Sequence, residues 1–454
     1  MVVRVKILLW HGYLMSGSGS NIYTYNVAAA WRRLGHEVLV MCQERTAASL
    51  PIVDADGSFA ADNLSFDVAS TGTAGAGGSC TVIRPDIGGL LPVYVYDDYD
   101  GFEVKRFVDL SDEELDRYTT ANITAMTTAL NSFGPDVVII GHEVMGPYIA
   151  LRACPQTGHR YVAKLHGSAL EYAVKKQDRY VRYATEGLCG AHRVVGGSRY
   201  MLAEASAVIP GWVEDATVVN PGVDTDLFRP APARAATATV AYVGKLIAAK
   251  GVHHLIAALG ATTVPGLEAV IVGYGGDESA LVEFHDALAH GDIRTARAVV
   301  GRLAYSDEVV GFLDGVDAAY LERASTIPVR FTGRLDHGPL SEVLPSFDVL
   351  VVPSVVPEAF GMVAAEAAAC GVLPLVPGHS GIAEAGAALE EYLGAPGLLT
   401  FDHSSPVEQI ATGIDRILAI DPATRIAMGA KASACAHDRW SWGHVAESLL
   451  RAAR

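Results

Sequence analysis

Short apolar runs alternate with longer helical stretches along almost the whole chain, and this alternation constrains the fold more than any other feature of the sequence. The runs are rich in Val, Ile and Leu, as expected of strands that are buried on both faces of a parallel sheet. Helical stretches between such strands are typical of right-handed βαβ units. The sequence therefore predicts an α/β protein.

Eleven segments have the length and composition of buried strands. They are Lys6–Trp10, Glu37–Cys42, Val137–Ile140, Tyr161–Leu165, Arg193–Val195, Thr217–Val219, Thr239–Val243, Glu268–Val272, Val329–Thr332, Val349–Val352 and Leu373–Val376. Because this number exceeds what one doubly wound sheet usually holds, we expect two Rossmann-like parallel sheets.

A turn and a proline-containing linker separate the two expected sheets. Asn220–Asp224 has turn chemistry, and Arg229–Ala236 is rich in Ala and Pro. We therefore predict a first domain over residues 1–222 and a second over 237–435. A C-terminal helix at about 436–454 is expected to pack back on the first domain.

Composition excludes several classes of protein. The 454 residues include 34 Lys and Arg against 51 Asp and Glu, a net charge of −17, which argues against a nucleic-acid binder. No apolar run is long enough to cross a bilayer, and the N-terminus lacks the pattern of a signal peptide. The six cysteines contain no C-x-x-C pair, so we expect reduced core thiols in a cytoplasmic protein.

Two regions depart from the regular alternation. Ala69–Ser79 consists almost wholly of Gly, Ala, Ser and Thr, and a flexible loop is expected there. Residues 277–327 have three helical patterns, Glu278–His290, Arg294–Leu303 and Glu308–Leu313, between two strands of the second domain. We interpret this region as a helical insertion on the surface of that domain.

The segment that follows Val349–Val352 contains two glutamates, Glu358 and Glu366, and opens an alanine-rich helix at about Phe360 or Gly361. Its loop is expected at the carboxyl edge of the second sheet, where open α/β sheets bind ligands. The helix start offers N–H groups to a phosphate. Two carboxylates about 12 Å apart along the helix axis suit a sugar and a ribose at the ends of a diphosphate. We expect Glu366 to be exposed; the alternative is a capping Glu followed by a solvated one.

Two lysines follow the strand Thr239–Val243. Lys245 and Lys250 lie in one loop, before a helix expected at Val252–Leu259. Converging ammonium groups at the carboxyl end of a strand suit a diphosphate in an otherwise acidic protein. Further strand-then-glycine turns, Ile271–Gly276 and Phe331–Leu335, are expected at the same edge.

In the first domain, the loop Ser16–Asn21 carries Gly17 and Gly19 before a helix. It resembles a dinucleotide-binding loop, but Ile22 stands at the third glycine position, which argues against NAD. His166 lies on a glycine turn after another strand, and it is either a substrate contact or a structural histidine.

Together these segments resemble glycosyltransferase family 4, whose members are retaining enzymes with the GT-B fold of two Rossmann-like domains. The resemblance is to an actinobacterial-like member with a helical insertion in the donor domain. The matching segments are Gly17–Gly19, Leu34–Val38, His166-Gly167, Asn220–Asp224, Gly244-Lys245 with Lys250-Gly251, and the E-x7-E pair Glu358 and Glu366 with Phe360-Gly361.

The resemblance implies roles for the matched residues. His166 and Glu358 would act on the donor sugar as catalytic residues, and Glu366 would bind the ribose. Arg334 and Leu335 would contact the base through their backbone. The donor diphosphate would be bound by Lys245, Lys250, Gly17, Gly19, Phe360 and Gly361. The family usually has Arg where Lys245 stands, and lysine lacks the bidentate geometry of arginine.

The implied reaction transfers a sugar from a nucleotide diphosphate sugar to a small-molecule acceptor, with no metal and no cofactor. Asp97–Asp100 resembles a D-x-D metal motif, but we assign it no metal. The alternatives are a nucleotide-sugar epimerase, a sugar phosphorylase, or a non-catalytic nucleotide-sugar-binding protein. The acceptor is expected to lie against first-domain loops, no nucleic acid is expected to bind, and a homo-oligomer is left open.

Overall fold

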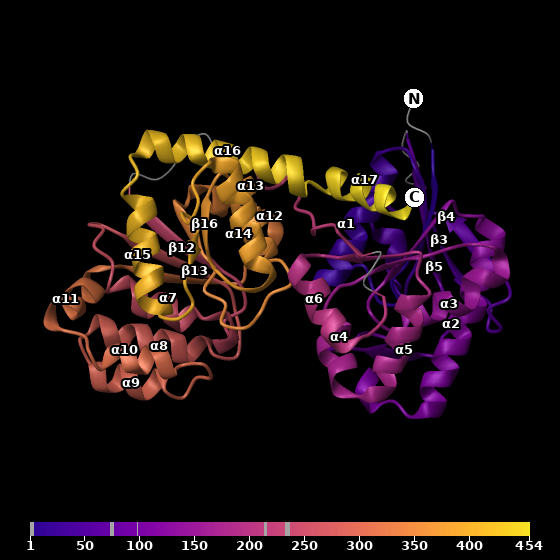
Figure 1. Ribbon diagram of the computed structural model, residues 1–454, viewed down its shortest axis with the longest axis horizontal. Helices are drawn as coiled ribbons and strands as arrows, with labels where there is room; N and C mark the ends of the chain where they lie inside the picture. Colours follow the sequence, from indigo (N-terminus) through magenta and orange to yellow (C-terminus); the bar gives the residue numbers. More distant parts are fainter. Residues whose placement is uncertain (1–3, 73–76, 98, 213–215, 232–236) are drawn as a thin grey trace. The chain divides into compact units, whose positions relative to one another are not determined.

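The computed structural model describes residues 4–72, 77–97, 99–212, 216–231 and 237–454. The chain forms two compact units. Unit 1 comprises Met1–Gly222 and Trp442–Arg454, and unit 2 comprises Val223–Ser441. Helices cover a central sheet in each unit (Figure 1), so the prediction of two parallel-sheet α/β domains is confirmed.

Unit 1 is built on a nine-stranded sheet with the order β11-β10-β9-β8-β1-β2-β5-β3-β4. All neighbouring strands are parallel except β3 and β4, and β6 and β7 form a separate parallel pair. Its elements are β1 (Lys6–Trp10), α1 (Gly19–Arg33), β2 (Glu37–Met41), η1 (Ala47–Ser49), β3 (Ala55–Phe59), β4 (Phe66–Ser70), β5 (Ser79–Arg84), β6 (Leu90–Val93), β7 (Glu103–Arg106), η2 (Phe107–Asp109), α2 (Asp112–Phe133), β8 (Val137–Gly141), α3 (Gly146–Thr157), β9 (Val162–Lys164), α4 (Ser168–Tyr172), η3 (Val174–Lys176), α5 (Asp178–Cys189), β10 (Arg193–Gly196), α6 (Arg199–Val208), β11 (Ala216–Val218) and α17 (Trp442–Ala453).

Unit 2 has a six-stranded, wholly parallel sheet with the order β14-β13-β12-β15-β16-β17. Its elements are β12 (Thr239–Val243), η5 (Ala248–Lys250), α7 (Val252–Leu259), β13 (Glu268–Val272), α8 (Glu278–Ala289), α9 (Ile293–Val300), α10 (Asp307–Leu313), α11 (Ala318–Thr326), β14 (Val329–Gly333), α12 (His337–Val343), η6 (Leu344–Ser346), β15 (Val349–Val351), α13 (Met362–Ala369), β16 (Leu373–Pro377), α14 (Ser380–Leu393), β17 (Thr400–Phe401), α15 (Pro406–Leu418) and α16 (Pro422–Trp440).

The C-terminal segment is divided between the two units. α16 continues to Trp440 in unit 2, so the expected helix over 436–454 is in fact two helices separated at Ser441. α17 packs on α1 in unit 1, where Trp31 Nε1 donates to the Ala446 carbonyl at 2.9 Å. The last helix thus completes the apolar cover of the first sheet.

The helical insertion is present and contains a fourth helix, α11, that the sequence pattern did not predict. Its helices do not simply lie on the surface, because Phe284, Val299 and Leu313 are buried in the same hydrophobic core as the strands of unit 2. The insertion is therefore an integral layer of unit 2.

Other predictions need correction. Six described strands, β3 to β7 and β17, were not among the eleven expected. The expected loop over 69–79 is shorter in the structure, because its first two residues belong to β4 and its last residue belongs to β5. Residues 73–76 of this loop and residues 232–236 of the linker lie outside the described residues. Five cysteines are buried, but Cys189 is exposed. None of the helices in the described part of the chain has the length and apolar composition needed to cross a membrane.

Candidate functional site

The carboxyl edge of the unit 2 sheet brings several of the predicted site residues together. Strand order reverses between β12 and β15, since β13 and β14 lie on one side of β12, and β15 and β16 extend the sheet on the other. Such a switch point is where open α/β sheets bind ligands. The loop after β12 carries the two lysines, and the loop after β15 leads to Glu358.

Lys250 and Glu358 meet at this switch point. Lys250 Nζ donates to Glu358 Oε1 at 2.8 Å, and the Ser354 hydroxyl donates to the same carboxylate oxygen. The backbone N–H of Glu358 donates to Ser380 Oγ at 3.0 Å. The Glu358 side chain is only 15% exposed, so its carboxylate is fixed by these contacts. The sequence indicated neither Ser354 nor Ser380.

The helix start beside Glu358 is formed by Gly361. This residue has φ +87°, and a Cβ atom there would lie 2.6 Å from Ile382 Cγ1, so only glycine fits without strain. α13 begins at the next residue, and the first N–H groups of a helix have no acceptor within it. The Phe360 ring is buried against Trp440, with 5.5 Å between ring centroids, which leaves only its backbone for a ligand.

The prediction that Glu366 is exposed is wrong, because the structure buries this residue. Only 8% of the residue is accessible, and this burial raises the pKa of its carboxyl group to about 8. The nearest basic group is His337 Nε2, at 3.8 Å from Glu366 Oε1. The other faces of α13 pack into the core, whereas the Glu366 side chain stays 10% exposed beside the half-exposed His337.

Of the remaining donor-site candidates, Lys245 and Arg334 are exposed. Lys245 has no ion-pair partner among the described residues and extends from the loop after β12. Arg334 pairs with Asp336 Oδ1 at 2.9 Å and lies 5.4 Å from the centroid of the Tyr274 ring. Leu335 is partly buried against the core. All of these follow strands of the same parallel sheet.

The other three predicted residues, Gly17, Gly19 and His166, belong to unit 1. Gly17 is exposed with φ +94°, and Gly19 is the first residue of α1. His166 follows β9, and its ring contacts Tyr23 of α1 with 5.1 Å between centroids. His166 and the glycine loop therefore flank the same end of the unit 1 sheet.

Two histidines that the sequence analysis missed join His166. His11 follows β1 and His142 follows β8, and the rings of His142 and His166 are 4.9 Å apart. His11 and His142 stack at 5.1 Å. Three adjacent strands thus each end in a histidine, and the available signal was the same strand-then-histidine pattern that singled out His166. Burial lowers the pKa of all three imidazoles, so the cluster is uncharged at neutral pH.

Two buried ionisable groups lie next to these histidines. Glu143 is wholly buried, and its Oε1 accepts from the Gly167 N–H at 2.7 Å, which fixes the turn that carries His166. Lys164 Nζ donates to the Val219 carbonyl at 3.0 Å. Burial raises the pKa of Glu143 and lowers that of Lys164 to about 7.

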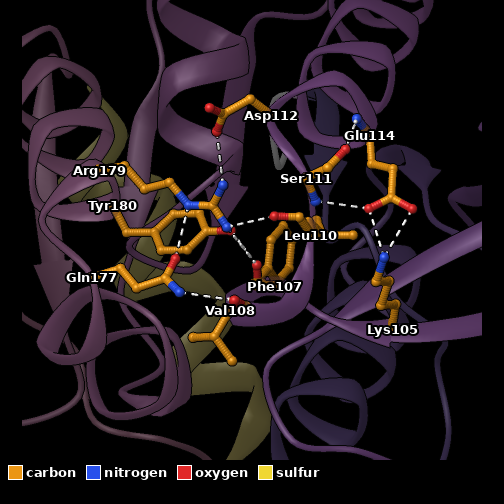
Figure 2. A network of polar contacts seen from close by, with 10 residues as sticks. All are labelled: Lys105, Phe107, Val108, Leu110, Ser111, Asp112, Glu114, Gln177, Arg179 and Tyr180. Atoms are coloured by element: carbon orange, nitrogen blue, oxygen red, sulfur yellow. Dashed lines mark hydrogen bonds and ion pairs between the residues drawn. The ribbon is translucent and has the colours of Figure 1, made fainter.

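A polar network holds the segment 105–111, which carries Phe107 (Figure 2). Arg179 of α5 donates to the carbonyls of Phe107 and Leu110 at 3.3 and 2.8 Å and to Asp112 Oδ1 at 2.9 Å. The Phe107 ring stacks on Tyr94 at 4.8 Å, and Tyr94 in turn contacts His142. The network therefore holds the aromatic wall beside the histidines.

Within the described ranges, no three His, Cys, Asp or Glu side chains lie together in a way that could hold a metal ion. The D-x-D-like segment 97–100 includes Asp98, which is not among the described residues.

Family models match both units. A glycosyl transferase 4-like domain matches residues 18–222, and a glycosyl transferases group 1 domain matches residues 318–433. The first match includes Gly19, His142 and His166, and the second includes the two glutamates. The chain belongs to glycosyltransferase family 4.

Curated relatives of this family 4 chain include D-inositol 3-phosphate glycosyltransferases of Mycobacterium tuberculosis and Mycobacterium bovis. Each is 30% identical over 246 residues, which is 52% of this chain and 43% of the relative. The match thus spans less than half the length of these relatives.

Solved structures share the fold over the whole chain. A glycosyltransferase from Rickettsia africae has a TM-score of 0.64 at 13% identity, covering 99% of this chain and 97% of that one. Anabaena HepE in complex with UDP and glucose has a TM-score of 0.60 at 15% identity, covering 99% of both chains. The catalytic domain of Arabidopsis thaliana starch synthase IV, bound to ADP and acarbose, has a TM-score of 0.58 at 12% identity, covering 99% and 98%. The two units therefore have the GT-B fold of the family.

Proposed function

We propose that this family 4 chain is a retaining glycosyltransferase, which moves a sugar from a nucleotide diphosphate sugar to a small-molecule acceptor without a metal. The observation that carries the proposal is the Lys250–Glu358 pair at the switch point of the unit 2 sheet, beside the start of α13. A cation, a carboxylate and free helix N–H groups at one strand edge suit a sugar joined to a diphosphate.

In the proposed reaction, negative charge grows on the leaving diphosphate. Lys245, Lys250 and the N–H groups at Phe360 and Gly361 would stabilise that charge. Because these groups supply positive charge and hydrogen-bond donors at the leaving oxygen, the mechanism needs no divalent cation. By the family resemblance, Gly17 and Gly19 would also serve the diphosphate.

The remaining roles also come from the resemblance. Glu358 would accept hydrogen bonds from sugar hydroxyls, and Glu366 would bind the ribose hydroxyls. Arg334 and Leu335 would contact the base through backbone groups. His166 would act at the reacting face of the sugar, and its lowered pKa supports a neutral imidazole there. Retention of the anomeric configuration is inferred from the E-x7-E pair.

Two features support a nucleotide sugar and a small acceptor. HepE was solved with UDP and glucose, and starch synthase IV with ADP and acarbose. The curated relatives carry D-inositol 3-phosphate, a small soluble molecule, in their name. Both family models describe glycosyl transferases, which favours transfer over epimerisation or phosphorolysis.

A panel of UDP-, GDP-, ADP- and TDP-sugars tests the proposal. Thermal shift on the full chain is expected to single out one nucleotide, since a ligand at 100 times its Kd stabilises by about 2.7 kcal/mol. NMR of the product from that donor and a mixture of small acceptors is expected to show the donor's anomeric configuration. Rapid epimerisation of the donor without acceptor, or no response to any donor, would refute the proposal.

A further inference from the structure

The helical insertion begins at the candidate donor site. Its first residue, Asp277, follows β13 through the turn 273–276. This turn lies at the same sheet edge as the loop after β12 that carries Lys245 and Lys250, which we call the lysine loop. The N–H of Asp277 donates to the Leu246 carbonyl at 3.1 Å. The insertion and the lysine loop are therefore joined by backbone contact where the insertion starts.

The Asp277 side chain makes a second contact with that loop. Its Oδ2 accepts from the N–H of Ala248 at 2.7 Å. Ala248 is the first residue of η5, the single 3-10 turn that ends at Lys250 and that we call the lysine turn. The first N–H groups of such a turn have no partner inside it, so Asp277 supplies the acceptor that the turn lacks.

This use of the Asp277 carboxylate differs from that of similar residues in the insertion. Asp277 is the N-cap residue of α8, yet its side chain makes no capping bond to that helix. Asp292 and Asp317 are the N-cap residues of α9 and α11, and they accept from the N–H groups of Thr295 at 3.1 Å and Tyr320 at 2.8 Å. Asp277 thus leaves its own helix uncapped and holds the lysine turn.

The opposite side of the turn rests on rigid backbone. The Ala249 carbonyl accepts from the N–H groups of Val355 and Val356 at 3.1 and 3.3 Å. Gly251 has φ +69°, and a Cβ atom on it would lie 1.9 Å from the Pro353 carbonyl oxygen. The turn therefore lies between the loop that leads to Glu358 on one side and Asp277 on the other.

The insertion also holds the helix that follows the turn. The buried His253 of α7 donates from Nε2 to the Tyr305 carbonyl at 3.0 Å, and a carbonyl can only accept. His254 Nε2 lies 3.4 Å from Glu308 Oε2 of α10. Lys250 is thus followed directly by residues that are anchored to the insertion.

From these contacts we propose that Asp277 is a positioning residue for Lys250, through which the helical insertion holds the diphosphate-binding turn in place. The inference rests on the proposed function, since it assigns Lys250 to the donor diphosphate. Asp277 itself does not touch the donor. It acts by satisfying the Ala248 N–H, which sets the direction in which Lys250 leaves the turn.

The test compares nucleoside diphosphates with the matching monophosphates on the full-length chain. Calorimetry with UDP and UMP, GDP and GMP, and ADP and AMP isolates the contribution of the second phosphate. Asp277→Ala is expected to reduce the preference for diphosphate about tenfold, the size of one weakened charge-assisted contact. Asp277→Asn keeps an oxygen acceptor without its charge and is expected to lose about threefold.

Asp292→Ala is the matched control, because it removes a helix cap from the same insertion without touching the lysine turn. It is expected to lower the melting temperature while leaving the diphosphate preference unchanged. Equal loss of preference in Asp292→Ala and Asp277→Ala would mean a purely structural role and overturn the inference. An unchanged preference in Asp277→Asn overturns it as well, even where Asp277→Ala does not fold.

The result also separates the inference from the proposed function. If the wild-type chain binds diphosphates more tightly than monophosphates and the Asp277 variants do the same, only the inference fails. If the wild-type chain binds none of the nucleotides, the proposed function fails and the inference falls with it.

Discussion

Lys250 Nζ and Glu358 Oε1 are 2.8 Å apart and form an ion pair between the loops that follow β12 and β15. The proposal assigns these two groups to neighbouring parts of one donor, the diphosphate and the sugar. Each therefore holds the other in place at the edge of the sheet. A donor that binds here meets a carboxylate and an ammonium group that are already oriented.

Lys250→Ala is expected to weaken binding of the nucleoside diphosphate by about tenfold or more, as for loss of one charge-assisted contact. It also leaves Glu358 without its ion-pair partner. Lys245→Ala is the informative comparison, because Lys245 makes no ion pair in the described part of unit 2. Calorimetry and urea unfolding should show weaker binding in both variants but a stability loss only in Lys250→Ala.

Glu358→Gln is expected to abolish turnover with little change in nucleotide affinity, because the carboxylate is assigned to the sugar end of the donor. The amide can still accept from Ser354, so the loop should keep its shape. Single-turnover kinetics and nucleotide calorimetry measure the two effects separately. Full activity in Glu358→Gln would remove this residue from the catalytic set.

Glu366 predicts a pH dependence of stability. Burial raises its pKa from 4.5 to about 8, so between these values the folded chain keeps a proton that the unfolded chain has released. Stability therefore falls as pH rises through this window, by up to about 1.4 kcal/mol per pH unit. Urea unfolding should show that Glu366→Gln gains stability relative to wild type from pH 5 to pH 8. A constant difference across that range contradicts the assignment. Nucleotide calorimetry should also show weaker binding in the variant.

Much of the architecture was predictable, because strands buried on both faces are continuous apolar runs. Two of the strands that were missed, β3 and β4, differ in this respect. β4 (Phe66–Ser70) is an edge strand with four exposed residues, and β3 includes Asp56, Gly57 and Ser58. Neither has the apolar run or the clear alternation that predicts a strand, because one or both faces are open to solvent.

The site was predictable where each loop carries a recognisable motif, and not where only the strand order reveals that residues are neighbours. Lys250 and Glu358 each follow a recognisable strand, and parallel strands end at the same edge. Joining His11 and His142 to His166 requires the strand order β9-β8-β1, which the local sequence does not contain. The burial of Glu366 also depends on tertiary packing, since an apolar helix does not reveal which face is covered.

Arg179→Lys is expected to destabilise unit 1. The guanidinium group satisfies the carbonyls of Phe107 and Leu110 together with Asp112, and one ammonium group cannot span all three (Figure 2). The Phe107 carbonyl keeps the Tyr180 hydroxyl as a donor, so the loss falls on the Leu110 carbonyl, and a buried acceptor left without a partner costs about 1–3 kcal/mol. Arg182→Lys, an exposed change in the same helix, is the control and should stay within about 0.5 kcal/mol of wild type. Equal urea midpoints for the two variants would contradict the structural role of the network.

His11 offers the sharpest check on the electrostatics of unit 1. Asn21 Nδ2 donates to the Ser16 carbonyl at 2.5 Å, so its Oδ1 faces His11 and accepts from Nε2 at 2.8 Å. Burial lowers the pKa of His11 from 6.5 to about 4. Between these values the unfolded chain binds a proton that the folded chain does not, so the stability contributed by the neutral ring is complete above pH 6.5 and is lost as pH falls toward 4.

NMR of the His11 Cε1 proton should therefore show a constant shift from pH 8 down to pH 5.5. The His142 ring stacks on His11 and is also buried, and its pKa is lowered as well. Neither ring is therefore expected to take up a proton in this pH range. A titration midpoint near 6.5 for His11 would mean that the imidazole is solvated. The histidine cluster would then carry positive charge at mildly acidic pH, which contradicts the uncharged cluster that the burial of the three rings indicates.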